Sequence, residues 1–110
     1  MELNITVSEI QSLATNGKVY TRGRSYADAG LVGSMAWDPA AGLLQARVMS
    51  ADELHNDLVK IKLNSRFRPQ RIGCTCAASR RYAGCCKHET AVLLVSMNTQ
   101  LERLPAVLPE

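Results

Sequence analysis

All four cysteines of the chain and one of its two histidines fall between residues 74 and 88. Cys74 and Cys76 are separated by one residue, and the same spacing separates Cys86 from His88. Residues two apart on a strand point to the same side, so the first pair can present both sulfurs together. The nine residues between the pairs let the chain fold back on itself. Two facing pairs of soft ligands suit a tetrahedral zinc ion, so the spacing predicts a zinc site.

Other cysteine chemistries fit this sequence less well than metal binding. A disulfide is disfavoured because no secretion signal is visible and each close pair is badly spaced to bridge with itself. An iron–sulfur cluster would need all four cysteines, and the adjacent Cys85 and Cys86 give it an awkward geometry. A Cys–His nucleophile would need an orienting group that the motif does not contain. Inert buried thiols would not explain the clustering.

Cys85 leaves one ambiguity within the zinc interpretation. The spacing from Cys85 to His88 also suits a pair of ligands, as does the spacing from Cys86 to His88. The sequence spacing therefore leaves the two adjacent cysteines as alternatives for the third ligand.

Positive charge is concentrated in the same part of the chain. The chain carries a net charge of +3, but the 31 residues from Leu58 to His88 contain no acidic residue. A solvated basic surface would explain this pattern, and so would an anionic partner. The complete absence of acidic residues favours the anionic partner. The eight basic residues of this segment are Lys60, Lys62, Arg66, Arg68, Arg71, Arg80, Arg81 and Lys87.

The elements that would position these residues predict an α+β domain. The chain of 110 residues is long enough for one domain, and its 46 % apolar residues can form a core. Two N-terminal helices are expected, over 6–17 and 18–30. The first has a capping box formed by Thr6 and Glu9. Gly23 counts against the second helix, because glycine costs about 1 kcal/mol relative to alanine.

A small antiparallel sheet is expected to follow the two helices. Strands are predicted over 31–38, 43–50 and 57–63, where apolar and polar residues alternate in the last. The segment 66–76 is its expected hairpin partner. A three-residue loop at 64–66 would place Lys60, Lys62 and Arg68 on one outward face.

A third helix is expected over 86–99, with an apolar centre that predicts burial on more than one side. The prolines that follow it, Pro105 and Pro109, favour a tail over a core segment. The sequence thus predicts one domain over residues 1–97 and a tail or linker over 98–110.

The arrangement C-x-C, a spacer and C-x-H resembles the SWIM zinc finger. Cys74-Thr75-Cys76 and Cys86-Lys87-His88 match this signature, and the segment 89–95, ETAVLLV, is similar to the helix that follows it. The segment 22–32, RGRSYADAGLV, resembles the region upstream of the finger in bacterial SWIM-containing proteins. The resemblance implies a C-terminal ββα finger and one structural Zn²⁺ ion. The ligands that it implies are Cys74, Cys76, Cys86 and His88, which leaves Cys85 as a free thiol.

The resemblance also bears on function. SWIM fingers occur in helicase-like ATPases, transposases and ubiquitin-pathway proteins, and they bind DNA or proteins. With four protein ligands the zinc has no open position for substrate, so the site is expected to be structural and the chain non-enzymatic. The chain also lacks a phosphate-binding glycine-rich loop, a nucleophile elbow and a paired-carboxylate motif.

Nucleic acid is therefore the first expected partner, DNA more than RNA, bound weakly and with little sequence specificity. A protein partner, or a neighbouring domain of a larger protein, is the alternative. Tyr82 lies in a basic loop and could stack on a base, whereas Trp37 is expected in the core or on a strand and His55 on the surface. The expected nucleic-acid contacts are Lys60, Lys62, Arg66, Arg68, Arg80, Arg81, Tyr82 and Lys87.

The expected location is the cytoplasm. The first ten residues do not resemble a signal peptide, and no stretch of eighteen apolar residues occurs, so neither secretion nor a membrane partner is expected.

Overall fold

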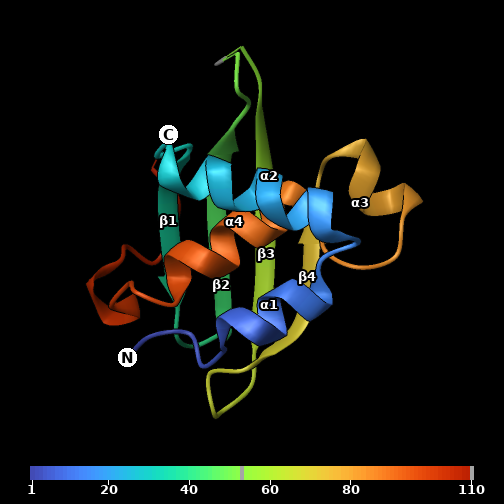
Figure 1. The fold of residues 1–110 in the computed structure, drawn as a ribbon. Helices are drawn as coiled ribbons and strands as arrows, with labels where there is room; N and C mark the ends of the chain where they lie inside the picture. Colours follow the sequence, from blue (N-terminus) through green and yellow to red (C-terminus); the bar gives the residue numbers. More distant parts are fainter. Residues whose placement is uncertain (53, 110) are drawn as a thin grey trace.

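The computed structural model describes residues 1–52 and 54–109. Its sheet has four antiparallel strands in the order β1-β2-β3-β4, and helices cover one of its faces (Figure 1). The predicted α+β class is confirmed. The strands are β1 (Val32–Asp38), β2 (Leu43–Met49), β3 (Asn56–Leu63) and β4 (Pro69–Cys74). The helices are α1 (Val7–Leu13), α2 (Gly17–Asp28), α3 (Ala77–Arg81), α4 (Lys87–Ser96) and the short 3-10 helix η1 (Leu101–Arg103).

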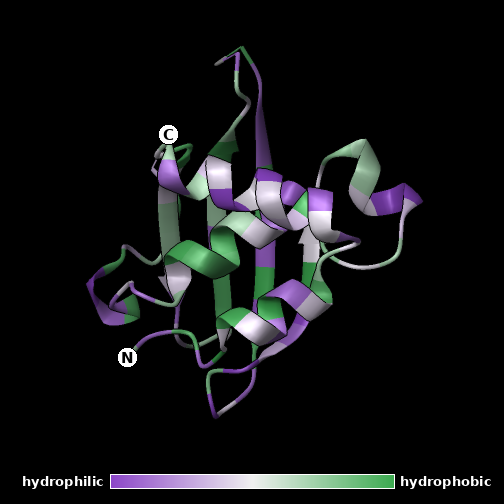
Figure 2. Ribbon diagram, viewed as in Figure 1, coloured by the Kyte–Doolittle hydropathy of each residue, from purple (hydrophilic) through white to green (hydrophobic). Residues whose placement is uncertain are grey.

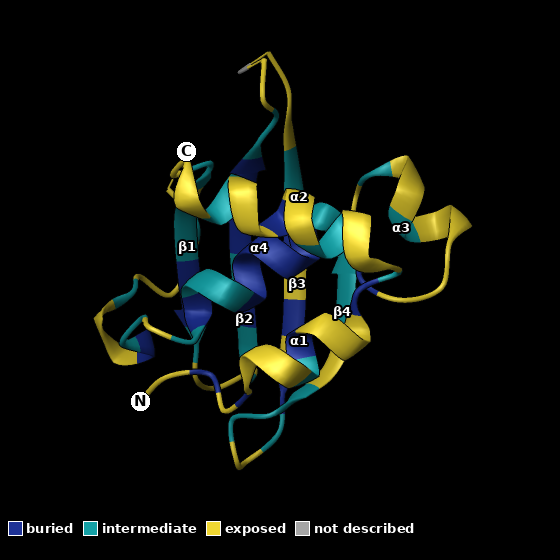
Figure 3. Cartoon of the chain, viewed as in Figure 1, coloured by how far each residue is buried: buried dark blue, intermediate teal, exposed yellow. Residues whose placement is uncertain are grey.

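The core lies between the sheet and α4. Alternate residues of β2 and β3 are fully buried on the helix side, while their neighbours are exposed or half-buried on the other side. Figure 2 shows this alternation along β3 and the hydrophobic surface of α4. Because α2 packs along α4 from outside, α4 is buried nearly all round, as Figure 3 shows. This confirms the prediction made from its apolar centre. The largest fully buried apolar side chains are Ile10, Leu44, Ile61, Leu93 and Leu101.

The glycine in α2 is explained by its neighbour. A Cβ atom added at Gly23 would lie 2.6 Å from the Cβ atom of Thr90, so only glycine lets the two helices approach this closely. The expected cost to helix formation is offset by this packing. The capping box at Thr6 and Glu9 is present as predicted, and Asn16 caps α2.

The hairpin between β3 and β4 differs from the expected one. Its loop is longer than three residues, because Asn64 N donates to Arg68 O at 3.0 Å and Phe67 adopts a positive φ of 61°. Phe67 packs beside Trp37, with ring centroids 5.9 Å apart, which offsets the cost of this backbone conformation. Leu63 therefore pairs with Pro69, and Lys62 with Arg71.

The segment after α4 packs on the domain, contrary to its expected role as a tail or linker. Leu101 is fully buried, and Leu104 packs against the core. Leu101 N donates to Met1 O, and Trp37 N donates to Pro105 O, both at 2.8 Å. Proline lacks a backbone N–H but keeps its carbonyl group, and the carbonyl is the group that Trp37 N needs as an acceptor here. The prolines are therefore compatible with this packing.

No helix among the described residues is both long enough and apolar enough to cross a membrane.

Candidate metal centre

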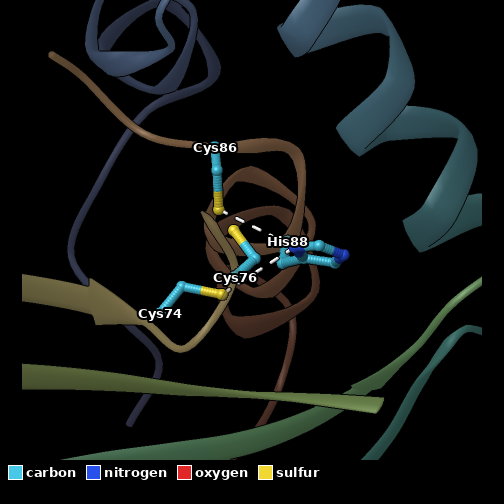
Figure 4. Close-up of side chains that lie close together, drawn as sticks. All are labelled: Cys74, Cys76, Cys86 and His88. Atoms are coloured by element: carbon cyan, nitrogen blue, oxygen red, sulfur yellow. Dashed lines mark hydrogen bonds between the residues drawn. The ribbon is translucent and has the colours of Figure 1, made fainter. Parts of the chain in front are cut away.

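Three elements that begin or end at the same place bring the four expected ligands together. Cys74 is the last residue of β4, and Cys76 caps the start of α3. Cys86 caps the start of α4, and His88 is the second residue of that helix. One ligand atom from each residue lies within 4.8 Å of all the others. The close-up in Figure 4 shows the four side chains gathered at this place. The four side chains could hold one metal ion.

The distances suit a tetrahedral ion. His88 Nδ1 lies 3.8 Å from Cys74 Sγ and 3.9 Å from Cys86 Sγ. Metal–ligand bonds of about 2.0–2.3 Å, arranged tetrahedrally, separate neighbouring ligand atoms by roughly 3.5–3.8 Å. Closing the cluster on an ion thus needs only small side-chain movements.

Cys86 is held by the first turn of α4. Glu89 N donates to Cys86 Sγ at 3.4 Å, and Cys86 N donates to Glu89 Oε1 at 2.8 Å, which forms a reciprocal cap. In the metal-free protein the hydrogen bond to Cys74, and then burial, raise the pKa of the Cys86 thiol. Burial also raises the pKa of Cys76. An ion must therefore displace protons from these thiols in order to bind.

His88 is oriented by an acidic residue that the sequence analysis did not select. His88 Nε2 lies 3.6 Å from Asp57 Oδ2, on the side of the ring away from the sulfurs. Thr75 Oγ1 donates to Asp57 Oδ1 at 2.9 Å and accepts from Leu58 N at 3.0 Å. The alternation along the predicted strand could have pointed to Asp57. It lies two residues before the buried Val59, so both side chains face the helices.

The helix α2 covers the imidazole. The ring of Tyr26 meets that of His88 edge-on, with centroids 5.6 Å apart. Lys87 Nζ lies 5.3 Å from the centroid of the same tyrosine ring. His88 is thus only 5 % exposed, so water has little access to its ring.

Cys85 lies outside the cluster, although spacing alone left it as an alternative. Its side chain is buried in the hydrophobic core, and burial raises its pKa to about 12. Its backbone joins the first helix, because Cys85 N donates to Leu13 O at 2.7 Å and Thr15 N donates to Cys85 O at 3.1 Å. The structure therefore brings Cys86, and not Cys85, to the other three ligands.

The residues expected to bind nucleic acid are divided among several surfaces. Lys60 and Lys62 project from the face of the sheet that no helix covers. Arg66 lies in the turn between β3 and β4. Arg80 and Arg81 end α3, which replaces the loop expected there, and the exposed Tyr82 follows them. Lys87 contacts Tyr26 at the start of α4.

Arg68 does not share the outward face with Lys60 and Lys62, so this prediction is wrong. Its guanidinium group forms an ion pair with Glu9 and donates to Asn4 O at 3.2 Å. The longer turn rotates Arg68 to the helix side of the sheet. Arg71 takes the expected place instead, directly opposite Lys62.

The uncovered face of the sheet thus contains a basic group, which we call the basic face: Arg47, Lys60, Lys62 and Arg71. Arg47 lies on β2, outside the basic segment of the sequence, and pairs with Leu58. The residues that β2, β3 and β4 direct to this side include no carboxylate. Strand pairing was needed to find this group, because it combines three strands.

No protein-family model matches the chain, and neither a curated protein nor a solved structure was found to match it.

Proposed function

We propose that the chain is a non-enzymatic binding module with one structural zinc ion. The supporting observation is the donor set of three sulfurs and one imidazole nitrogen within 4.8 Å. Thiolate and imidazole ligands favour zinc over magnesium or calcium, which prefer oxygen. Four protein ligands fill a tetrahedral shell and leave no position for a substrate. The resemblance to SWIM fingers agrees with this proposal.

The zinc ion would join the end of the sheet to the start of the buried helix. Cys74 ends β4 and Cys76 caps α3, while Cys86 caps α4 and His88 lies in its first turn. The ligands thus come from two junctions of the chain. An ion bound by both would fix the helix on the sheet and position α3 between them. Its free energy of binding would therefore add directly to the free energy of folding.

The basic face is the surface that we propose for nucleic acid. Its side chains are spaced by about 7 Å along a strand and about 5 Å between strands, as expected for alternate residues of a sheet. Such an array can contact several backbone phosphates at once, and phosphate contacts carry no base specificity. Aromatic side chains that could stack on bases do not project from β2, β3 or β4 on this face. Binding should therefore be weak, salt-dependent and largely indifferent to sequence.

A salt titration of binding to a labelled DNA duplex tests this assignment. At about 50 mM salt the zinc-loaded chain should bind, and affinity should fall steeply with salt. Lys60→Gln with Lys62→Gln should weaken binding and reduce the salt slope by about two. Lys18→Gln, on the exposed side of α2, is the matched control and should change neither quantity much.

The same titration separates the basic face from α3. If Arg80→Ala with Arg81→Ala abolishes binding while the double lysine variant leaves it unchanged, α3 is the nucleic-acid surface and the basic face is not. Absence of any binding to DNA or RNA at low salt would refute the nucleic-acid proposal and leave a protein partner. The zinc proposal would be unaffected.

A further inference from the structure

The two edges of the sheet differ in their hydrogen bonding. At the β1 edge, Trp37 N donates to Pro105 O at 2.8 Å, so the segment after α4 covers part of that edge. At the β4 edge, no strand among the described residues pairs with the side of β4 away from β3. Unpaired edge strands are ready templates for another strand, and proteins commonly protect them.

The pairing within the hairpin identifies the free backbone groups of β4. Thr75 N donates to Leu58 O at 3.1 Å, so Leu58 and Thr75 form a hydrogen-bonded pair. Because such pairs alternate along an antiparallel ladder, Gly73 and Arg71 also direct their backbone groups to β3. Ile72, which lies opposite Ile61, must then direct its N–H and C=O outward, whereas the register shift between Lys62 and Leu63 interrupts this alternation at Gln70. Among the described residues, no side chain and no segment outside the strands forms a hydrogen bond with the backbone of Ile72.

A groove runs along each side of this edge. The helix-side groove, of about 630 Å³, has both apolar and polar lining residues, and the apolar ones include Ile5, Leu13 and Ile72. The groove on the other side has a volume of about 800 Å³ and is lined by Lys60, Lys62 and Arg71. Side chains of a strand placed beside β4 would alternate between these two grooves.

We propose that β4 accepts an extended segment of a partner protein as a fifth strand. In that segment, acidic side chains facing the basic face alternate with aliphatic side chains facing the helix-side groove. Main-chain hydrogen bonds to Ile72 provide the docking, and the two grooves provide the specificity. The charge of Arg71 and Lys62 selects acidic residues on one side of the strand.

A second copy of this chain suits the edge poorly. Antiparallel pairing of two β4 strands about a two-fold axis would place both basic faces on the same side of a joined sheet. Arg71 of each copy would then lie close to the arginine and lysines of the other, and like charges across a strand pair are destabilising. An acidic partner segment removes this repulsion.

The test uses the full zinc-loaded chain and a fluorescein-labelled peptide that alternates glutamate and valine. Binding is measured by anisotropy, and the exchange of backbone amides is followed by NMR. The expected result is binding together with slowed exchange of the Ile72 amide. A peptide of the same composition with its glutamates in one block, and a peptide alternating lysine and valine, should bind at least about tenfold more weakly.

Two variants probe the edge directly. Ile72→Pro removes the outward N–H of the edge, so it should weaken peptide binding about fivefold to tenfold. Arg71→Glu should weaken it by a similar factor and provides a second reading if the proline variant unfolds. Arg24→Gln, at an exposed position of α2 outside both grooves, is the control and should leave peptide binding unchanged.

Equal binding of the alternating and blocked peptides, or binding without protection of the Ile72 amide, would overturn the proposal in favour of unspecific charge attraction. DNA binding with no peptide binding would overturn it too, while leaving the proposed nucleic-acid function intact. If the chain binds the peptide but no nucleic acid, the result would support strand addition at β4 and reject the proposed nucleic-acid function.

Discussion

His88 lies between two kinds of partner: its Nδ1 atom faces the cysteine sulfurs, and its Nε2 atom lies 3.6 Å from Asp57 Oδ2. A carboxylate behind a metal-binding imidazole fixes the tautomer and increases the electron density on the coordinating nitrogen. Asp57 is the second residue of β3, so this contact also ties the orientation of the ligand to the sheet. The strand and the helix N-terminus together set the geometry of the proposed metal site.

Replacement of this carboxylate should therefore weaken metal binding without abolishing it. We expect Asp57→Asn to lower the zinc affinity by about tenfold to a hundredfold, with one ion still bound at saturation. Competition with a chromophoric chelator measures the affinity. Asp52→Asn, in an exposed position before β3, is the control. Equal affinities for both variants would show that Asp57 does not orient the ligand.

Metal content should distinguish the two adjacent cysteines. We expect one zinc ion per chain by elemental analysis, and loss of much of the folded signal in circular dichroism after chelation. Cys86→Ser should reduce the metal content sharply. Cys85→Ala should retain one ion and lose only packing free energy, about 1–2 kcal/mol. Retention of metal by the Cys86 variant together with its loss in the Cys85 variant would reverse the assignment.

Zinc binding should release protons, because the pKa values of Cys76 and Cys86 are raised in the metal-free protein. A raised thiol pKa favours the protonated thiol, so it stabilises the metal-free fold below about pH 9 and this contribution is lost at higher pH. Zinc binds the deprotonated thiolates, so its affinity should instead increase as the pH rises. The apparent affinity should increase up to about 10²-fold per pH unit near neutrality, as for release of one proton from each of these two thiols. Calorimetry in buffers of different ionisation enthalpy counts these protons, and a count near zero would contradict thiolate ligation.

Gly23→Ala tests the close contact between α2 and α4. Helix propensity alone predicts that alanine stabilises by about 1 kcal/mol. The added Cβ would lie 2.6 Å from Thr90 Cβ, so we expect net destabilisation of about 1–3 kcal/mol in thermal or denaturant unfolding. Gly17→Ala is the matched control, since nothing lies within 4 Å of its added Cβ. A stabilised Gly23 variant would mean that the helices can separate at little cost.

The cysteine cluster was predictable because ligand spacing is a local property of the chain. Cys86 and His88 were expected at the start of a helix, and this prediction is correct. Cys74 and Cys76 were both expected on a strand, but β4 ends at Cys74 and Cys76 caps α3. Asp57 was not selected, because its role depends on which strand lies beneath α4. That pairing joins residues far apart in the sequence.

The hairpin shows where local rules failed. A three-residue loop was the simplest solution for 64–66, yet the side chain of Asn64 accepts from Arg66 N and Arg68 N and extends the turn. Packing of Phe67 on Trp37 then selects this longer turn. The resulting shift moves Arg68 to Glu9 and Arg71 to the basic face. Tertiary burial of an aromatic side chain thus decided which arginine faces solvent.

Pro105 at the β1 edge has a consequence for the size of any assembly built through the sheet. A sheet with two open edges can act as a repeating unit, because each added copy leaves another edge to extend. Here Trp37 N already donates to the chain's own Pro105, so an incoming strand could not form a complete ladder along β1. Strand addition should therefore favour the β4 edge, and with it one partner per chain rather than a filament.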